Sequence, residues 1–286
     1  MTALAQAIVE GPLPTARLTL HHLSIRHPGK PRVLLLGGSN FDLRLKRAFL
    51  DTSLAREAEL VTYEPRGIGR TERPDGAWTM EDYARDALAV LDALEWDQAV
   101  VIGESFGGMT ALHLALLAPE RVVGLVLSSA TAGGPNHASY DVSKFLKLPL
   151  EEAARRALCL QDSRHLALLE EDPVGFTRAL EARLAFEQAF RAPSVDSGGY
   201  ARLLEARRGH DCSDRVQKIQ HPTSVIAGRF DMQASPEAQE ALADALPNAD
   251  FVLLDAGHGV LFTDPEAVRI ATAAIHQQTS PKETPR

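Results

Sequence analysis

Residues 100–108 read Val-Val-Ile-Gly-Glu-Ser-Phe-Gly-Gly and constrain the fold more than any other stretch of the chain. The β-branched start of this segment is typical of a buried strand, and the apolar run at residues 109–118 is typical of a helix. Ser105 stands at the turn between them, with Gly103 and Gly107 on either side. A sharp strand-to-helix turn needs small residues at these positions, because larger side chains would collide where the chain folds back. The pattern predicts a nucleophile elbow around Ser105.

Short β-rich runs alternate with helix-length amphipathic runs, which predicts an α/β fold with a mostly parallel sheet and helices on both faces. Thr79 and Asp82 form a capping-box pattern at the start of a helix expected to end near Leu94. Two further helices are expected at residues 236–246 and 265–275. Residues 18–25 are expected to form an opening antiparallel strand or hairpin. The other expected strands are residues 32–36, 60–63, 100–102, 122–127, 223–227 and 251–254.

The alternation stops between residues 133 and 215. Instead of strand-length β-branched runs, this segment carries helical patterns at residues 150–160, 174–190 and 200–208. We therefore expect a helical cap inserted into an α/β core. The expected divisions are a core of residues 1–132 and 216–277, a cap of residues 133–215, and a flexible tail of residues 278–286, since the chain from His276 onward lacks a periodic apolar face.

Composition excludes several classes of function. The net charge of −8 opposes binding to nucleic acid or anionic lipid, which requires an excess of basic residues. No run reaches the roughly 18 apolar residues of a membrane span, and the N-terminus lacks the features of a signal peptide, so a cytoplasmic protein is expected. Cys159 and Cys212 are expected to be reduced and buried, because a domain of this size needs no disulfide.

A serine hydroxyl is a poor nucleophile at neutral pH and needs a histidine base, which an acid must orient. His258 follows the last expected strand between two glycines, and Asp231 follows the preceding strand. Both therefore emerge at the carboxyl edge of the sheet, where open α/β proteins build their sites. Asp255 is the alternative acid, but it lies only three residues before His258 and is not expected to reach the ring. His113, on the helix after Ser105, is expected to pack in the interior.

An acyl-transfer site also needs two preorganised backbone amides for the oxyanion. Phe106 is expected to supply one. Gly38, in the stretch Leu-Gly-Gly-Ser-Asn after an expected strand, is expected to supply the other, with Ser39 as the alternative. A phosphate-binding loop is disfavoured here, because no Lys-Ser or Lys-Thr follows the glycines and the spacing of a dinucleotide fingerprint is missing. No metal or cofactor is implied.

Four segments together resemble the α/β-hydrolase superfamily, in its esterase and proline-iminopeptidase-like branch. They are residues 103–108, 63–71, 227–231 and 257–258. The resemblance covers nearly the whole chain outside the cap. It implies an eight-stranded, mostly parallel sheet with an inserted helical cap. It also implies the roles of nucleophile for Ser105, acid for Asp231, base for His258, and oxyanion amides for Phe106 and Gly38.

The chain departs from this family in three places. Residues 63–71 resemble the family's Asp-x-Arg-Gly-x-Gly-x-Ser stretch, with Glu64 and Thr71 in place of its acid and hydroxyl residues. The oxyanion loop begins Leu-Gly instead of His-Gly, which is similar to hydrolases of the aclacinomycin methylesterase type. Glu104 precedes the serine where histidine is common, and it is expected to make a supporting hydrogen bond.

The resemblance implies a serine hydrolase of small carboxylic esters that works through an acyl-enzyme. Thioesterase, carbon–carbon bond hydrolase and proline iminopeptidase activities use the same triad and stay open, as does a non-catalytic receptor on the same fold. We expect a small-molecule ester or related acyl substrate and a monomer or homodimer, with neither nucleic acid nor membrane as partner. The aromatic residues expected to line a pocket or to pack the cap are Phe145, Phe176, Phe186, Phe190 and Tyr200.

Overall fold

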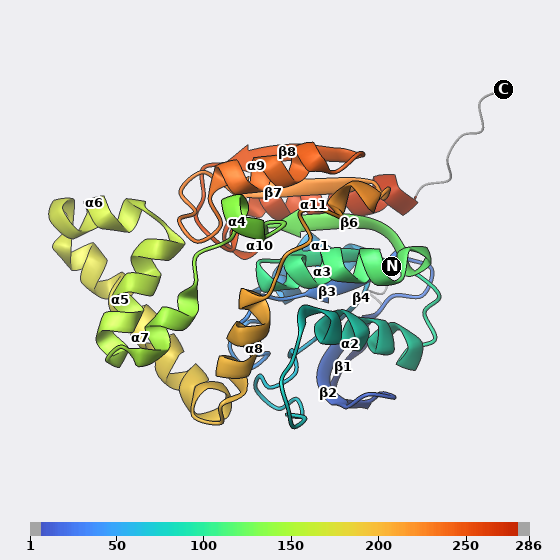
Figure 1. Ribbon diagram of the computed structural model, residues 1–286, viewed down its shortest axis with the longest axis horizontal. Helices are drawn as coiled ribbons and strands as arrows, with labels where there is room; N and C mark the ends of the chain where they lie inside the picture. The colour runs from blue at the N-terminus through green and yellow to red at the C-terminus, as the bar shows by residue number, and fades with distance from the viewer. Residues whose placement is uncertain (1–6, 280–286) are drawn as a thin grey trace, which may run out of the picture.

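An eight-stranded sheet runs through the middle of the molecule in the order β1-β2-β4-β3-β5-β6-β7-β8 (Figure 1). The computed structural model describes residues 7–279. The strands are β1 (Ala7–Pro14), β2 (Thr19–Arg26), β3 (Arg32–Leu36), β4 (Glu59–Tyr63), β5 (Ala99–Glu104), β6 (Val122–Ser128), β7 (Thr223–Gly228) and β8 (Ala249–Leu254). β1 and β2 pair antiparallel with each other, β2 pairs antiparallel with β4, and all the other pairs are parallel. The predicted fold class is confirmed.

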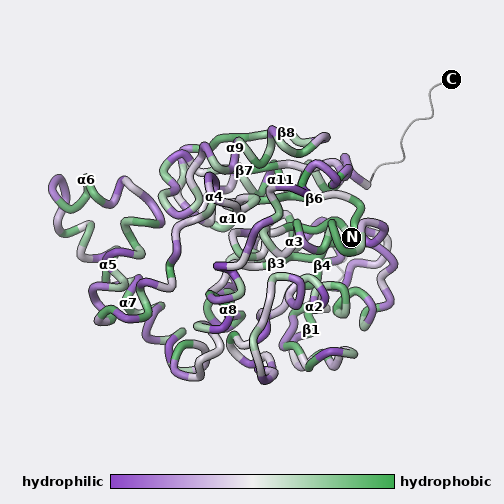
Figure 2. The backbone as a smooth tube through the Cα atoms, in the orientation of Figure 1, coloured by the Kyte–Doolittle hydropathy of each residue, from purple (hydrophilic) through white to green (hydrophobic). Residues whose placement is uncertain are grey.

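Helices cover both faces of the sheet and bury two apolar layers against it. Residues of α2 (Met80–Ala93), α3 (Phe106–Leu117) and α9 (Pro236–Ala245) pack in one layer. Residues of α1 (Ser53–Glu57), α10 (Val260–Thr263) and α11 (Pro265–Thr279) pack in the other. Figure 2 shows the hydrophobic segments gathered around the sheet and the hydrophilic ones mostly outside.

The start of α2 and the end of α11 can be compared with the helix limits predicted from the sequence. The predicted capping box is present at the start of α2, where Thr79 and Asp82 bond each other's backbone amides. Near the other end of the chain, α11 continues through Thr279, beyond its expected end at residue 275, so the predicted flexible tail is wrong for residues 278 and 279. Gln278 donates to the carbonyl of Leu125, which fixes this last turn to the sheet. The rest of the predicted tail, residues 280–286, lies outside the described residues.

The connection between β6 and β7 is helical. Its helices are α4 (Gly134–His137), η3 (Val142–Lys147), α5 (Leu150–Gln161), α6 (Arg164–Glu171), α7 (Pro173–Phe190), η4 (Arg191–Val195), α8 (Gly199–Arg208) and η5 (Val216–Lys218). The three helices α5, α6 and α7 project to one side of the sheet, at the left of Figure 1. α8 instead contributes Leu203 and Leu204 to an apolar cluster with Phe106 and Met109 of α3. The inserted segment is therefore anchored on the helix that follows the predicted elbow.

Four connections meet at the carboxyl edge of the parallel strands. Leu36 pairs with Gly103, Glu104 pairs with Ser128, and Gly228 pairs with Leu254. The loops after β3, β5, β7 and β8 therefore begin at the same edge of the sheet, although β7 and β8 extend about two residues further than β5. Parallel sheets of this kind place their sites at this edge.

The state of the cysteines and the lengths of the apolar helices relate to the cellular environment expected from the sequence. Cys159 is partly buried and Cys212 buried, and both are free. Among residues 7–279, none of the helices combines the length and the apolar character needed to cross a bilayer.

Candidate active site

The turn after β5 holds Ser105 in a strained backbone conformation, with φ 54° and ψ −116°. Residues other than glycine rarely adopt a positive φ, and such strain is typical of functional sites. Steric crowding by neighbouring backbone atoms explains why positions 103 and 107 are glycines. A Cβ on Gly103 would lie 2.5 Å from the Cα of Gly108, and one on Gly107 would lie 2.0 Å from the carbonyl oxygen of Leu36. The predicted turn between strand and helix is present, with Ser105 at its apex.

Ser105, His258 and Asp231 form a continuous chain of hydrogen bonds. Nε2 of His258 lies 2.8 Å from Oγ of Ser105, and Nδ1 of His258 lies 2.8 Å from Oδ2 of Asp231. The serine comes from the turn after β5, the acid from the loop after β7 and the histidine from the loop after β8. The structure thus brings together the three side chains that the sequence singled out.

Asp231 is fixed by its own loop. The backbone amides of Gln233 and Ala234 both donate to Oδ1 of Asp231, each at 2.8 Å, which leaves Oδ2 for the histidine. The Asp231 carboxylate is fully buried. Asp255, the alternative acid, points outward and pairs with Arg229 at 2.7 Å, with 77% of its side chain exposed. The structure therefore places Asp231, and not Asp255, against the imidazole.

The surroundings of His258 favour its protonated form. Burial alone would lower the pKa of the imidazole, but the charge and the hydrogen bond of Asp231, together with the charge of Glu104, outweigh it. The pKa of His258 is therefore raised above its ordinary value of 6.5. Such an imidazole accepts a proton more readily than a free histidine.

Two glutamines that the sequence analysis did not identify contact His258. The backbone amide of His258 donates to the carbonyl of Gln161 at 2.6 Å, and the Gln161 side chain donates back to the carbonyl of His258 at 3.3 Å. Nε2 of Gln233 lies 3.0 Å from Nε2 of His258, on the side that also faces Ser105. Gln161 ends α5, so the inserted helices help to hold the histidine loop. Gln233 could have been suspected from its place two residues after Asp231, whereas nothing in the sequence signals Gln161.

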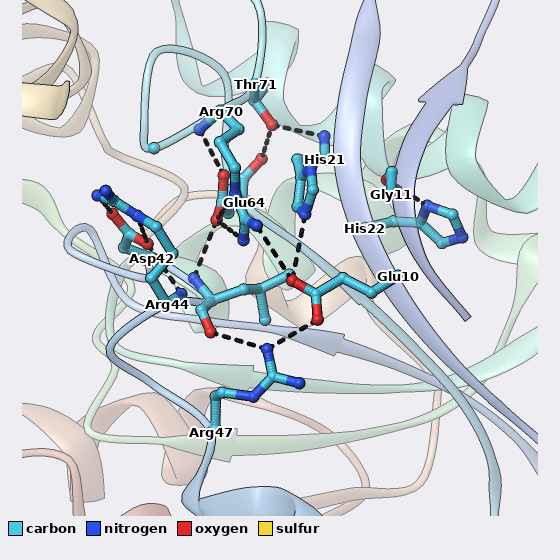
Figure 3. A network of polar contacts seen from close by, with 12 residues as sticks. Glu10, Gly11, His21, His22, Asp42, Arg44, Arg47, Glu64, Arg70 and Thr71 are labelled. Carbon is cyan, nitrogen blue, oxygen red and sulfur yellow. Dashed lines mark hydrogen bonds and ion pairs between the residues drawn. The ribbon is translucent and has the colours of Figure 1, made fainter. Parts of the chain in front are cut away.

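A buried glutamate supports the loop that follows β3. Glu64 accepts the backbone amide of Leu43 at 3.1 Å and pairs with Arg70 at 2.7 Å. Figure 3 shows this network continuing to Glu10 of β1, which contacts Arg70 and Arg47. The substitution of Glu64 for the family's aspartate thus keeps a carboxylate that ties the segment 63–71 to the predicted oxyanion loop.

Ser105 and His258 line a cavity of about 240 Å³ between the sheet edge and the inserted helices. Gly38 and Ser39 line it from the loop after β3, and α3 begins at Phe106 directly after Ser105. Of the five aromatic candidates, the ones that line the cavity are Phe145, Phe186 and Tyr200. Phe176 and Phe190 are buried within the helical packing instead. The cavity also carries charged side chains, namely Lys46, Glu104, Arg183, Glu187 and Arg191.

Glu104 does not make the predicted supporting hydrogen bond: among residues 7–279, its carboxylate has no donor within hydrogen-bond distance. The side chain lies against the predicted oxyanion loop, since a Cβ on Gly38 would be 2.7 Å from Oε2 of Glu104. The residue is 8% exposed and faces the cavity. Glu104 therefore acts on the site through its charge.

One set of three metal-ligating side chains lies close together within the described residues, namely His113, His210 and Cys212. The rings of His113 and His210 hydrogen-bond each other at 3.1 Å, and His210 also bonds the carbonyl of Thr131 at 2.8 Å. Burial lowers the pKa of both histidines to about 4 and raises that of Cys212 to about 12. Protein groups thus already satisfy this cluster, which links α3 to the segment after α8.

Comparisons with known proteins agree with this geometry. A family model described as alpha/beta hydrolase fold matches residues 31–265. The chain is 32% identical over 248 residues to the putative carbamate hydrolase RutD of Pseudomonas syringae pv. syringae strain B728a, which covers 84% of this chain and 91% of that protein. It is 30% identical over 255 residues to the poly(3-hydroxyalkanoate) depolymerase of Ectopseudomonas oleovorans, with 87% of each covered.

A solved structure supports the same relationship. The enol-lactonase from Burkholderia xenovorans LB400 matches with a TM-score of 0.73 and 25% identity, covering 94% of this chain and 99% of that one. Its match extends over the sheet and the inserted helices alike, because so little of either chain is left out. The sequence motifs, the sheet order and these matches lead to one conclusion: the chain belongs to the α/β hydrolase fold family.

Proposed function

We propose that this α/β hydrolase cleaves small carboxylic esters through an acyl-enzyme on Ser105. The observation that carries the proposal is the continuous hydrogen-bond chain from Ser105 through His258 to Asp231, with both distances at 2.8 Å. A serine hydroxyl becomes a nucleophile when a base takes its proton as it attacks, and an acid on the far side of the ring fixes the base in the required tautomer.

The steps follow from these contacts. Asp231 accepts a hydrogen bond from the Nδ1–H group of His258, which keeps the proton on Nδ1. Nε2 then takes the proton of Ser105 as Oγ attacks the ester carbonyl. The amides of Phe106 and Gly38 receive the negative charge that forms on the carbonyl oxygen. His258 then gives its proton to the leaving alcohol, and the acyl group stays on Ser105. Water, deprotonated by His258, releases the acid and restores the serine.

The size and position of the cavity support a small substrate. The cavity of about 240 Å³ lies directly over Ser105 and His258 and is covered by the inserted helices. We therefore propose that the segment 133–215 acts as a cap that selects the substrate, while the loops at the sheet edge perform the chemistry. A ligand that fills such a space is in contact with both parts.

The names of the relatives also support hydrolysis at a carbonyl. They are a putative carbamate hydrolase, a poly(3-hydroxyalkanoate) depolymerase and an enol-lactonase. By their names, the last two open ester bonds, one in a polymer and one in a ring. An ester is therefore the substrate class that the site and the relatives favour together.

Hydrolysis of p-nitrophenyl butyrate by the wild type and by Ser105→Ala tests the proposal. Losing the nucleophile of a triad costs on the order of 10⁶ in kcat, so the variant should fall to the background rate. Ser213→Ala is the matched control and should keep full activity, because Ser213 is an exposed serine outside the cavity whose hydroxyl donates to Asp211. A Ser105→Ala enzyme that retains more than a few per cent of the wild-type rate would overturn the proposal.

A further inference from the structure

Lys46 lines the same cavity as Ser105 and His258. It lies in the loop after β3, and its backbone amide is held by the carbonyl of Asp42 at 2.9 Å. Its ammonium lies 4.9 Å from the centroid of the Phe186 ring of α7. Lys46 therefore bridges the predicted oxyanion loop and the inserted helices at the wall of the cavity.

The ammonium of Lys46 has no hydrogen-bond acceptor and no ion-pair partner in the part of the chain that the structure describes. The neighbouring arginines of the same loop do have ion-pair partners. Arg44 pairs with Asp42, and Arg47 pairs with Glu10 at 2.7 Å. An ammonium offers three donors, and leaving them unused in a partly buried place is costly. The Phe186 face offsets part of that cost, but it accepts no hydrogen bond.

The other cap-side cations of the cavity are already paired. Arg183 donates to Glu187 at 2.7 Å and to Gln161 at 3.2 Å. Arg191 pairs with Asp196 at 3.1 Å. Among the described residues that line the cavity, Lys46 is thus the lysine or arginine without an ion-pair partner.

A charge of opposite sign, that of Glu104, faces the same cavity. Glu104 precedes Ser105 and lies against Gly38, and its carboxylate does not approach Lys46 within the 4.0 Å of an ion pair. Burial lowers the pKa of the Lys46 ammonium, and the charge of Glu104 acts in the opposite direction. The negative charge therefore lies against the predicted oxyanion loop, and the positive charge lies against the Phe186 ring. An anionic group on a substrate would be repelled from the first and attracted to the second.

We propose that Lys46 binds a carboxylate carried by the substrate, so that the preferred substrates are esters with a second, anionic end. This inference rests on the proposed ester hydrolase activity and adds its substrate class. Lys46 would hold the carboxylate at the cap side while Glu104 keeps it away from Ser105, which places the ester carbonyl over the nucleophile. Lys46 acts in specificity and takes no part in the bond-breaking steps.

Matched pairs of esters test the proposal, because each pair differs only in a carboxylate replacing a methyl group. One pair is mono-p-nitrophenyl glutarate and p-nitrophenyl pentanoate, with the charge on the acyl side. The other is 4-butyryloxybenzoate and p-tolyl butyrate, with the charge on the alcohol side. In at least one pair, kcat/KM of the wild type should favour the anionic ester, and Lys46→Met should reduce this preference by about 10- to 100-fold, since hydrogen bonds to charged groups carry this much discrimination.

Two further variants separate the role of Lys46 from a loss of packing. Lys46→Arg should recover part of the preference, because it restores the cation. Lys144→Met should change nothing, since Lys144 also lies over an aromatic ring, that of Tyr140 at 5.3 Å, but is exposed and does not line the cavity. The neutral esters are measured with every variant, so the effect of a Lys46 variant is taken from the ratio of the two kcat/KM values within a pair and not from the rate with one ester.

The outcomes distinguish this inference from the proposed function. A wild type that favours the neutral ester in both pairs, or a preference that Lys46→Met leaves unchanged, would overturn the role of Lys46 while ester hydrolysis stands. If none of the esters is hydrolysed, the proposed function fails. A binding measurement then tests whether Lys46 holds a carboxylate. Ligand-observed NMR with Ser105→Ala should then show stronger binding of monomethyl glutarate than of methyl pentanoate, and the difference should vanish in Ser105→Ala with Lys46→Met. Equal binding of the two compounds would contradict the inference.

Discussion

His258 lies between a hydrogen-bonded carboxylate and a more distant one, and both stabilise its imidazolium form. Because the neutral ring must accept the serine proton, kcat/KM should fall as the pH drops below a pKa that lies above 6.5. Glu104→Gln removes one of the negative charges that raise this pKa, so the acidic limb of the profile should move to lower pH. Profiles of kcat/KM against pH for the wild type and Glu104→Gln measure this shift. The same apparent pKa in both profiles would show that Glu104 does not act on His258.

Asp231 and Asp255 provide a matched test of the acid. Asp231→Asn should cost roughly 10⁴ in kcat, because an amide leaves His258 in the wrong tautomer. Asp255→Asn should cost little, since that carboxylate pairs with Arg229 at the surface. Steady-state hydrolysis of a p-nitrophenyl ester compares the two. A crippled Asp255→Asn beside a nearly normal Asp231→Asn would move the acid to the other loop.

The residues whose type is set by the proposed reaction could be predicted from the sequence. The residues that reach the site only through three-dimensional packing could not. Ser105 and His258 are flanked by glycines that allow their special turns, so they stand out in a sequence. Gln161 contacts His258 across 97 residues of chain, and the inserted helices bring it there. The free ammonium of Lys46 likewise becomes visible only when the pairing of its neighbours is known.

At the scale of single elements, the close contact between α3 and the loop after β3 determines how the elbow is built. A Cβ on Gly107 would lie 2.0 Å from the carbonyl oxygen of Leu36, and a backbone atom cannot move away cheaply. Gly107→Ala should therefore destabilise the protein by about 1 to 3 kcal/mol and reduce activity by shifting Ser105.

Thermal unfolding and ester hydrolysis together measure this effect. Gly209→Ala is the control, because Gly209 is exposed, has a negative φ of −79° and would place its Cβ at an ordinary 3.4 Å from its nearest neighbour. The control should match the wild type in both measurements. Equal melting temperatures for the two variants would contradict the packing argument.

The strands and helices of the core were predictable because their apolar periodicity is strong. β1 was missed, since its sequence holds a glycine and two prolines that lower strand propensity and are tolerated at the edge of a sheet. α6 was missed because it has only eight residues. The end of α11 was predicted too early, because Gln278 is fixed by a bond to β6 and not by an apolar face of its own.

At the scale of the whole molecule, the inserted helices and the sheet edge share one cavity, and we expect them to divide specificity from chemistry. Phe145 lines the cavity, whereas Phe176 of α7 is 4% exposed and buried among the inserted helices. Phe145→Ala should therefore change the relative kcat/KM for short and long esters by roughly 1 to 3 kcal/mol. Phe176→Ala should keep the wild-type ranking of esters and lose about 3 to 5 kcal/mol of stability.

A panel of p-nitrophenyl esters of increasing acyl length, measured beside chemical unfolding, separates these two effects. An unchanged ranking with Phe145→Ala would mean that the acyl chain lies elsewhere in the cavity. A changed ranking with Phe176→Ala at full stability would mean that the cap packs differently around the substrate.

We propose above that Ser105 carries the acyl group between the two halves of the reaction. Rapid acid quenching of the enzyme with a p-nitrophenyl ester, followed by mass spectrometry of its peptides, tests this claim most directly. We expect the mass of one acyl group on the peptide that contains Ser105, formed as fast as p-nitrophenol is released and absent from Ser105→Ala. Turnover without an acylated peptide, or acylation of another residue at the catalytic rate, would contradict it.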